Sequence, residues 1–272
     1  MQKAYRKLES QRKQTIGLSL VGLALELAGA ILIFTHHRLP GMILAMVGLI
    51  LFAAVIVVGR RRYEDACAQA RAEYSLGLER IQTISRKETA ALPLPAARFA
   101  PASQAADRPL YLHTMRGEVK RMPLLLTEVT LPYHLPGENA RQFLIGTLAS
   151  FEAPKCARKL LVFTGHPLGG SVREADYPGY QLLDTQGHAY RALSADGEPL
   201  SQAQSAAMDV FCAGEEKDAV ILADDGRVSV LFSSRFYSGS GALNTPLPAD
   251  ALKTSPLPGW DKVPALVRTL CK

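Results

Sequence analysis

Three polar residues, Glu128, His188 and Arg191, carry the side chains that folding would have to gather if this chain holds a site for a small ligand. Such a site needs a concave pocket in which at least two polar groups converge with shifted pKa values. No spacing in the sequence joins the three residues into a known motif. An enzyme or a small-ligand sensor is therefore the alternative hypothesis and not the leading one.

The histidines and cysteines form no metal-binding or redox motif. His36 and His37 are adjacent, so they point in different directions and are poorly placed to chelate one metal ion, and no HxxxH or HExxH pair occurs. The cysteines have no close partner and are predicted to be reduced thiols: Cys67, Cys156, Cys212 and Cys271. The sequence thus predicts no catalytic residue, no metal and no cofactor.

Three segments have the composition of a site but lack its context. Gly165–Ser171 is glycine-rich like a phosphate loop, but it has no Gly-Lys-Ser/Thr and no helix after it, which favours a connector. Asp224 and Asp225 are adjacent carboxylates whose position fits a turn better than a paired acid site. Ser238–Gly241 lacks the strand and helix of a nucleophile elbow.

Glu26 is the one ionisable residue within the apolar run Ile16–Phe34. A charge at the centre of a bilayer is costly, so this carboxyl is expected to be neutral or paired. Gly22, Glu26 and Ala30 recur every four residues and form a face where another helix can approach closely. We predict a packing role or a polar contact for Glu26, in preference to an ion path.

The run that contains Glu26 and a second apolar run, Leu39–Val58, are separated by only four residues. Each has the ~20 residues that a helix needs to cross ~30 Å of hydrocarbon, which predicts a transmembrane hairpin over residues 16–58. A signal peptide is the alternative, because a basic segment precedes the first run. The length of that run and the second run close behind it favour two spans.

Positive charge is concentrated beside the hairpin. Residues 1–88 carry 13 basic and 7 acidic side chains, whereas residues 89–272 carry 18 of each, within a net charge of +6. Basic residues precede the first span, and Arg60, Arg61 and Arg62 follow the second, so the positive-inside rule places both termini in the cytoplasm. These arginines are expected to contact lipid headgroups, and the neutral remainder argues against nucleic acid as a partner.

A juxtamembrane stalk helix is predicted over residues 59–88, followed by an Ala/Pro-rich linker over residues 89–109. Weakly apolar stalk residues step by three and four, as in a coiled coil: Cys67, Ala70, Tyr74, Gly77, Ile81 and Ile84. Self-association through this face is one interpretation. A solvated stalk, or a helix packed on its own domain, is the other.

Residues 110–240 are predicted to form a cytoplasmic α+β domain. Strand-like runs bounded by Pro or Gly lie at residues 124–133, 142–151 and 159–164, a helix is predicted at 199–213, and a β-hairpin is predicted at 218–232. One helix among strands favours a mixed α+β fold over repeating βαβ units.

The Pro-rich tail, residues 241–272, ends in a short amphipathic helix. Its apolar face consists of Trp260, Val263, Leu266, Val267 and Leu270. This face permits three outcomes, namely docking on the domain, contact with the membrane surface or binding of another protein.

The segment from Met115-Arg116-Gly117 to Leu126-Thr127-Glu128-Val129, together with the order of the parts, resembles the bacterial family called domain of unknown function 3137. The block from Tyr180 through the helix after Pro199 to the hairpin at Gly226 is similar as well. The resemblance covers about residues 1–240, and the chain departs from it at residues 165–180 and in the tail. It implies two spans before a cytoplasmic α+β domain and transfers no catalytic residue.

Together these features favour a two-pass protein of the bacterial cytoplasmic (inner) membrane. Its α+β domain is expected to bind a protein partner or to self-associate, as a membrane-anchored interaction or regulatory module. Self-association is expected to run through the spans and the stalk helix.

Overall fold

A computed structural model of the chain describes residues 1–92, 94–99, 109–134, 141–165, 172–213, 218–224, 226–237, 243, 248, 250 and 252–272, apart from the side chains of residues 97, 133, 134, 141 and 142. The chain divides into two units. The first contains residues 1–75 and 239–254, and the second contains residues 76–238 and 255–272.

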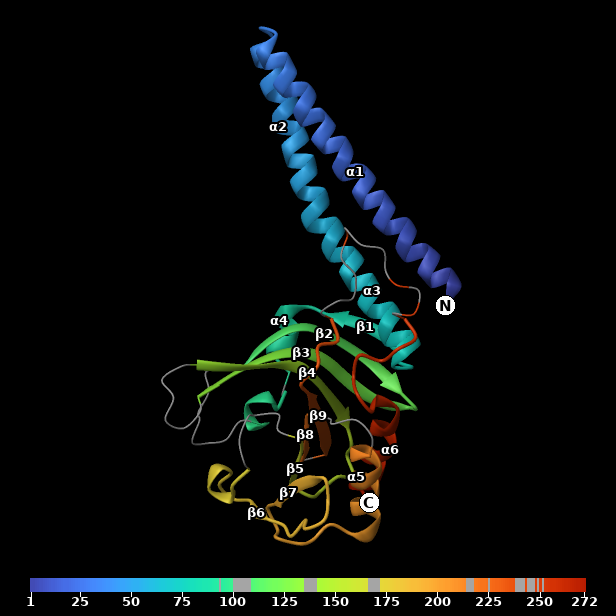
Figure 1. The fold of residues 1–272 in the computed structure, drawn as a ribbon, viewed down its shortest axis with the longest axis vertical. Helices are drawn as coiled ribbons and strands as arrows, with labels where there is room; N and C mark the ends of the chain where they lie inside the picture. The colour runs from blue at the N-terminus through green and yellow to red at the C-terminus, as the bar shows by residue number, and fades with distance from the viewer. Residues whose placement is uncertain are drawn as a thin grey trace. The chain divides into compact units, whose positions relative to one another are not determined.

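The first unit is built on a helical hairpin (Figure 1). α1 (Gln2–Phe34) and α2 (Arg38–Ala54) lie side by side, and each belongs to a helix long and apolar enough to cross a membrane. Glycines allow the two backbones to touch, because a Cβ on Gly29 would lie 2.4 Å from the Ala45 nitrogen. The helix pair is therefore held by close backbone packing, as is common between membrane helices.

A π-helical turn, Val55–Gly59, connects α2 to α3 (Arg60–Ser75). α3 packs against the start of α1 and a residue of the tail in a small core that contains Leu8, Tyr63, Cys67, Ala70 and Leu252. Cys67 and Ala70 belong to the predicted coiled-coil face and are buried within their own chain. This part of the stalk therefore packs against its own chain and does not present an exposed coiled-coil face.

α3 ends at Ser75, well before the predicted end of the stalk at residue 88. Gly77 has a φ of 64°, which glycine adopts without a steric penalty, and the leucines on either side of it are buried. The chain then continues as strand β1 (Glu79–Ile84). Burial of the leucines and pairing of the strand override the helix propensity of this segment.

The second unit is built on a nine-stranded sheet with the order β1-β2-β3-β4-β9-β8-β5-β7-β6. The strands after β1 are β2 (Leu110–Val119), β3 (Met122–His134), β4 (Arg141–Glu152), β5 (Leu160–Thr164), β6 (Gln181–Leu182), β7 (Tyr190–Ser194), β8 (Ala219–Asp224) and β9 (Arg227–Phe232). All neighbouring strands pair antiparallel. The predicted mixed α+β fold, without βαβ units, is confirmed for the described residues.

The predicted strands and hairpin lie within β3, β4, β5 and the β8–β9 pair. Asp224 pairs with Arg227, which leaves a two-residue turn in which Gly226 has a φ of 75°, as such hairpins require. The predicted helix is α5 (Gln202–Cys212), and its N-cap is Ser201. The Ser201 hydroxyl accepts the Gln204 N–H, and the Gln204 side chain accepts the Ser201 N–H, so this capping box begins the helix at Gln202, three residues after Pro199.

One face of the sheet packs on part of the predicted linker. Short helix α4 (Arg86–Ala90) is followed by the 3-10 turn Ala96–Phe99. Ala96 and Phe99 are fully buried in the main core with Val129, Leu148 and other strand residues. This stretch therefore belongs to the folded unit and is not a free linker.

The tail covers the other face. α6 (Val263–Leu270) lies beside α5 (Figure 1), and the turn before it places Trp260 on Phe151, with 6.0 Å between ring centroids. The Trp260 indole N–H donates to the Leu76 carbonyl at 2.8 Å. The whole predicted apolar face is buried, so docking on the domain is the outcome that the tail adopts.

Candidate functional site

The residues of the predicted ligand site are not brought together. Glu128 lies on β3, is 4% exposed, and accepts the Tyr237 N–H at 3.0 Å. Arg191 lies on β7, five strands away in the sheet order, which corresponds to about 24 Å. Strand pairing also places Arg191 on the opposite face of the sheet from Glu128.

His188 lies in a different environment from both Glu128 and Arg191. Its Nδ1 lies 2.7 Å from the Asp209 carboxylate on α5, and its ring lies 5.0 Å from the ring of Tyr190. Arg191 follows Tyr190 on β7 and points to the opposite face of the sheet. It donates to the Val172 carbonyl at 3.4 Å. The proposed grouping of Glu128, His188 and Arg191 is therefore corrected, because strand order and side-chain alternation separate them.

Glu26 lies at the contact between the paired helices. A Cβ on Gly48 would lie 2.5 Å from the Glu26 nitrogen and 2.7 Å from the Gly22 carbonyl oxygen. Gly22 and Glu26 thus belong to the close-approach face that the sequence predicts, with Gly29 as a further member. The backbone of Glu26 makes this contact, and a polar role for its carboxyl stays a prediction.

The three predicted lipid-facing arginines begin α3 and differ in their surroundings. Arg60 pairs with Glu64 one turn later at 2.7 Å. Arg61 is exposed. Arg62 is exposed as well, but it also lines a cavity in the helical unit.

This cavity has a volume of about 480 Å³ and lies where α1 passes the π-helical turn and the start of α3. It is open on one side and lined by Gln11, Gln14, Thr15, Leu18, Ala54, Val55, Val58, Gly59, Arg62 and Tyr63. A π-helical turn inserts an extra residue into the helix and is often found at functional sites. Here the π-helical turn forms the part of the cavity wall that lies between the apolar spans and the start of α3.

Two buried polar atoms of the lining lack hydrogen-bond partners among the described residues, the Gln11 Oε1 and the Tyr63 hydroxyl. Tyr63 is only 1% exposed. Buried polar groups are nearly always paired, and leaving one unpaired costs about 1–3 kcal/mol. Both atoms are covered by neighbouring protein atoms, so they lie behind the cavity wall and do not face the open space.

Electrostatics around Tyr63 keep its hydroxyl protonated. Burial raises the pKa of Tyr63 far above its usual value, and the nearby Cys67 thiol adds to the shift without a hydrogen bond of normal geometry. Burial likewise raises the pKa of Cys67 to about 11. The hydroxyl is therefore a neutral group able to donate one hydrogen bond and to accept others at physiological pH.

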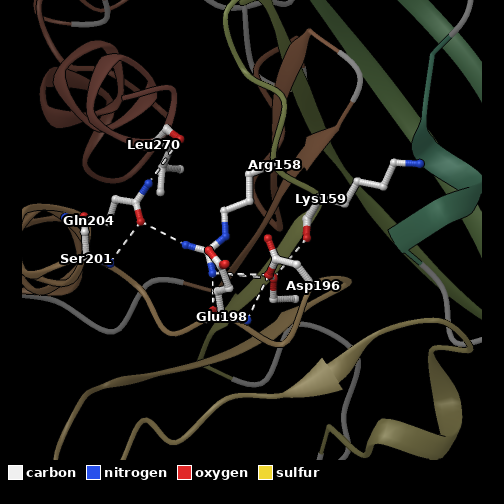
Figure 2. A network of polar contacts seen from close by, with 8 residues as sticks. Arg158, Lys159, Asp196, Glu198, Ser201, Gln204 and Leu270 are labelled. Atoms are coloured by element: carbon white, nitrogen blue, oxygen red, sulfur yellow. Dashed lines mark hydrogen bonds and ion pairs between the residues drawn. The ribbon is translucent and has the colours of Figure 1, made fainter.

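A second polar cluster, in the sheet unit, surrounds Arg158, whose buried Nε has no hydrogen-bond partner among the described residues. Figure 2 shows the Arg158 guanidinium pointing between Gln204 and the loop after β7. It donates to the Gln204 Oε1 at 3.1 Å and to the Glu198 carbonyl, and it lies 3.6 Å from the Asp196 carboxylate. Gln204 in turn donates to the Leu270 carbonyl at 3.4 Å. This network links the segment before β5 to α5 and α6, and we assign it a structural role.

Asp224 is buried and paired. Its carboxylate forms an ion pair with Arg98 and lies 3.9 Å from the Lys159 ammonium. Asp224 is therefore not a solvated turn residue. Asp225 lies outside the described residues. His166–Ser171 of the glycine-rich segment and Ser238–Gly241 lie outside them as well.

No group of three or more potential metal ligands occurs among the described residues. The cavity residues Gln11 and Tyr63 were not singled out in the sequence, because neither forms a motif. One signal was present, since polar residues at 11, 14 and 15 precede the first span at helical spacing and an Arg-Tyr pair follows the second.

No family model and no curated protein matches this chain. Among solved structures, the chain is similar to the crystal structure of the mycobacterial trehalose monomycolate transport factor A, TtfA. The two share 10% sequence identity, with a TM-score of 0.39, over 75% of this chain and 92% of that chain.

Proposed function

We propose that this chain is a two-pass membrane protein, with both termini in the cytoplasm of a bacterium, whose α+β unit is a membrane-anchored protein-interaction or regulatory module. The observation that carries the proposal is the outward apolar surface of the helical hairpin. Ile31, Leu39 and Ile50 are 63%, 72% and 62% exposed, while glycines fill the contact between the helices. Lipid is the solvent in which such a surface is stable.

Orientation is supported by the basic residues at the two ends of the hairpin. The turn between the helices carries Arg38 alone, whereas both outer ends carry several Lys or Arg. Cytoplasmic loops hold this excess in membrane proteins. Membership of the domain of unknown function 3137 family stays part of the proposal, on the sequence motifs alone.

The interaction role is supported by an apolar patch at the end of the sheet. Leu110 on β2 and Phe143 on β4 are 42% and 54% exposed among the described residues. Strand pairing sets them on the same face, on either side of Thr130 and Pro132 of β3. Exposed apolar groups that cluster in this way are typical of protein-binding surfaces.

Topology is tested by cysteine labelling of whole cells. Single cysteines at position 37 and at position 3, in a chain whose native cysteines are serine, are treated with a membrane-impermeant maleimide. Position 37 is expected to react in intact cells, and position 3 only after lysis. The reverse pattern would contradict the orientation, and reaction of both in intact cells would contradict a two-pass arrangement.

The interaction role is tested by crosslinking in the membrane followed by mass spectrometry. We expect the wild type to capture a discrete partner and Phe143→Ser to lose it, because the variant removes the more exposed of the two apolar side chains. Val210→Ser is the matched control, since Val210 is 57% exposed on α5, away from the patch. Equal capture by all three proteins would place the interaction elsewhere, and an absence of any partner would contradict the module.

A small-ligand sensor is the second candidate function. The cavity beside the π-helical turn supports it, because it is a space of small-molecule size lined by both polar and apolar residues.

A further inference from the structure

The side of α1 that contains Glu26 is only partly covered by the second helix of the pair. The backbone of Glu26 packs on Gly48, and the residue is partly exposed. Its carboxyl forms no hydrogen bond or ion pair with any residue that the structure describes. The hydrocarbon layer offers neither water nor a polar lipid group at this depth, so the carboxyl needs a protein partner.

The residues beside Glu26 form a seam suited to a further helix. Four residues lie along one side of α1 with spacings of four, three and four, namely Ser19, Leu23, Glu26 and Ala30. Each is at least partly exposed, and three of the four are small or polar. Such residues allow membrane helices to approach closely and to hydrogen-bond. We call these four residues the Glu26 seam.

The outward side of α1 has a different character. Leu20, Leu27 and Ile31 are 58%, 58% and 63% exposed, and all three are large and aliphatic. They offer a surface for lipid and no hydrogen-bonding group. The chemistry of the helix surface therefore favours the Glu26 seam, and not this side, for association with another helix.

A second copy of the chain supplies the group that Glu26 lacks. Within the two apolar runs, only Ser19 and Glu26 have side chains that hydrogen-bond, and the Ser19 hydroxyl already donates to the Ile16 carbonyl at 2.7 Å. Copies inserted with the same topology have Glu26 at the same depth, so a twofold axis along the membrane normal places the two carboxyls opposite each other. A protonated carboxyl both donates and accepts, so the two carboxyls can satisfy each other with two hydrogen bonds.

We propose that the chain forms a parallel homodimer in the membrane through the Glu26 seam, with the two protonated Glu26 carboxyls hydrogen-bonded to each other across the twofold axis. The inference rests on the proposed membrane insertion and names a second copy of the chain as the partner of the hairpin. A different membrane protein fits less well, because it would have to present a polar group at the same depth. Each dimer carries two α+β units, so a partner with two binding sites gains avidity.

Cysteine crosslinking in liposomes tests which side of α1 meets the second copy. Ala30→Cys and Ala28→Cys are made in a full-length chain whose native cysteines are serine, and each is reconstituted at high dilution in lipid and treated with a mild oxidant. Ala30→Cys is expected to form a disulfide-linked dimer. Ala28→Cys is the matched control, because Ala28 is exposed but lies about 160° away around the helix. Equal crosslinking of both would indicate random collision and overturn the proposal.

Substitutions of Glu26 test the hydrogen bonds. Glu26→Leu is expected to raise the dissociation constant of the dimer at least about tenfold, measured by energy transfer between labelled copies, because two hydrogen bonds within the membrane are lost. Glu26→Gln is expected to keep the dimer, since a carboxamide also donates and accepts. Leu27→Ala, on the outward side, is the control that should leave the dissociation constant unchanged. An unchanged Glu26→Leu dimer would overturn the proposal, as would equal losses in Glu26→Leu and Glu26→Gln.

Helicity and flotation separate loss of the dimer from loss of folding or insertion. Glu26→Leu replaces a polar side chain by an apolar one in the hydrocarbon layer, so its circular dichroism and its flotation with liposomes are expected to match those of the wild type. A wild type that does not float contradicts membrane insertion and with it the dimer, whereas one that floats as a monomer contradicts only the dimer. Crosslinking of Ala30→Cys in cell membranes to another protein, and not to a second copy, would overturn the homodimer and assign the seam to that protein.

Discussion

Asp196 shows how a single loop carboxylate is used to hold an element. The Ser194 hydroxyl donates to it, the Glu198 N–H donates to it at 3.0 Å, and Arg158 lies 3.6 Å away. These contacts, with the Ser194 hydrogen bond first, lower the pKa of Asp196 below its usual value of 3.8. The ionised form is therefore the one that stabilises the loop between β7 and α5.

Asp196→Asn is expected to lower the free energy of unfolding of the sheet unit at pH 7 by no more than about 1 kcal/mol, because the side chain is 42% exposed and water screens it. A lowered pKa contributes stability that is complete above pH 3.8 and is lost as pH falls through the folded value. Urea unfolding at several pH values should therefore show the two proteins converging below pH 3.8. A constant difference down to pH 2 would contradict the role of the charge.

Cys156, in the loop after β4, and Cys271, directly after α6, form a thiol pair. A hydrogen bond from the Cys271 thiol lowers the pKa of Cys156 to about 7, and the same contact with burial raises the pKa of Cys271. One thiolate therefore forms near neutral pH beside a second, protonated thiol. This is the arrangement from which a disulfide closes when an oxidant accepts two electrons.

Diamide is expected to join Cys156 to Cys271 within one chain, with a rate that rises as pH increases through about 7, because the thiolate is the attacking form. The two thiols lose two protons and two electrons, and the azo group is reduced to a hydrazine. Peptide mapping identifies the bond, and Cys271→Ser is the control that should block it. Exclusive pairing of Cys156 with Cys212 would contradict the contact.

At the scale of elements, α6 acts as a structural cover for the sheet. Trp260 is buried, stacks on Phe151 and lies near Phe232, and it hydrogen-bonds to the Leu76 carbonyl. The tail thereby connects the segment before β1 to the strands β4 and β9 at the middle of the sheet. The apolar face that the sequence indicated is used for this contact.

Trp260→Ala is expected to destabilise the sheet unit by about 3–5 kcal/mol, because it opens a large cavity under α6. Trp260→Phe keeps most of the packing and leaves the Leu76 carbonyl without its donor, so a smaller cost of about 1–3 kcal/mol is expected. Chemical denaturation followed by circular dichroism measures both. Equal costs for the two variants would mean that the hydrogen bond, and not the packing, holds the tail.

At the scale of the whole molecule, the boundaries of the sheet unit differ from those of the predicted domain. The prediction begins at residue 110, whereas β1 and the buried pair Ala96 and Phe99 lie before it. β1 pairs with β2, and Ala96 and Phe99 pack against core residues of β3 and β4. A chain that starts at residue 110 lacks an edge strand, part of the core and the acceptor for Trp260.

A fragment of residues 76–272 is therefore expected to unfold cooperatively, whereas a fragment of residues 110–272 is expected to be at least about 3 kcal/mol less stable. Thermal unfolding by circular dichroism and binding of a hydrophobic dye compare them directly. Identical midpoints would contradict the assignment of β1 and Phe99 to this unit. Both fragments lack the apolar hairpin, so neither comparison depends on a membrane.

Features that depend on neighbours along the chain could be predicted from the amino-acid sequence. The length and apolarity of residues 16–58 predict the helix pair, and two apolar runs on either side of Asp224-Asp225-Gly226 predict the β8–β9 hairpin, because these signals are local. The apolar face of the tail helix was predicted for the same reason. The surface that it contacts was not predicted, because three different surfaces could bury the same stripe of apolar side chains.

Contacts between residues far apart in the sequence could not be predicted and are seen only in the folded chain. Glu128, His188 and Arg191 have suitable chemistry, but strand order and the alternation of faces keep them apart. Gln11 and Tyr63 belong to no motif, yet antiparallel helices and a π-helical turn place both at one cavity. Helix propensity favours a continuous stalk, whereas pairing of residues 79–84 with β2 makes a strand. Long-range pairing is the physical reason in each case, because it is set by partners that a local pattern does not contain.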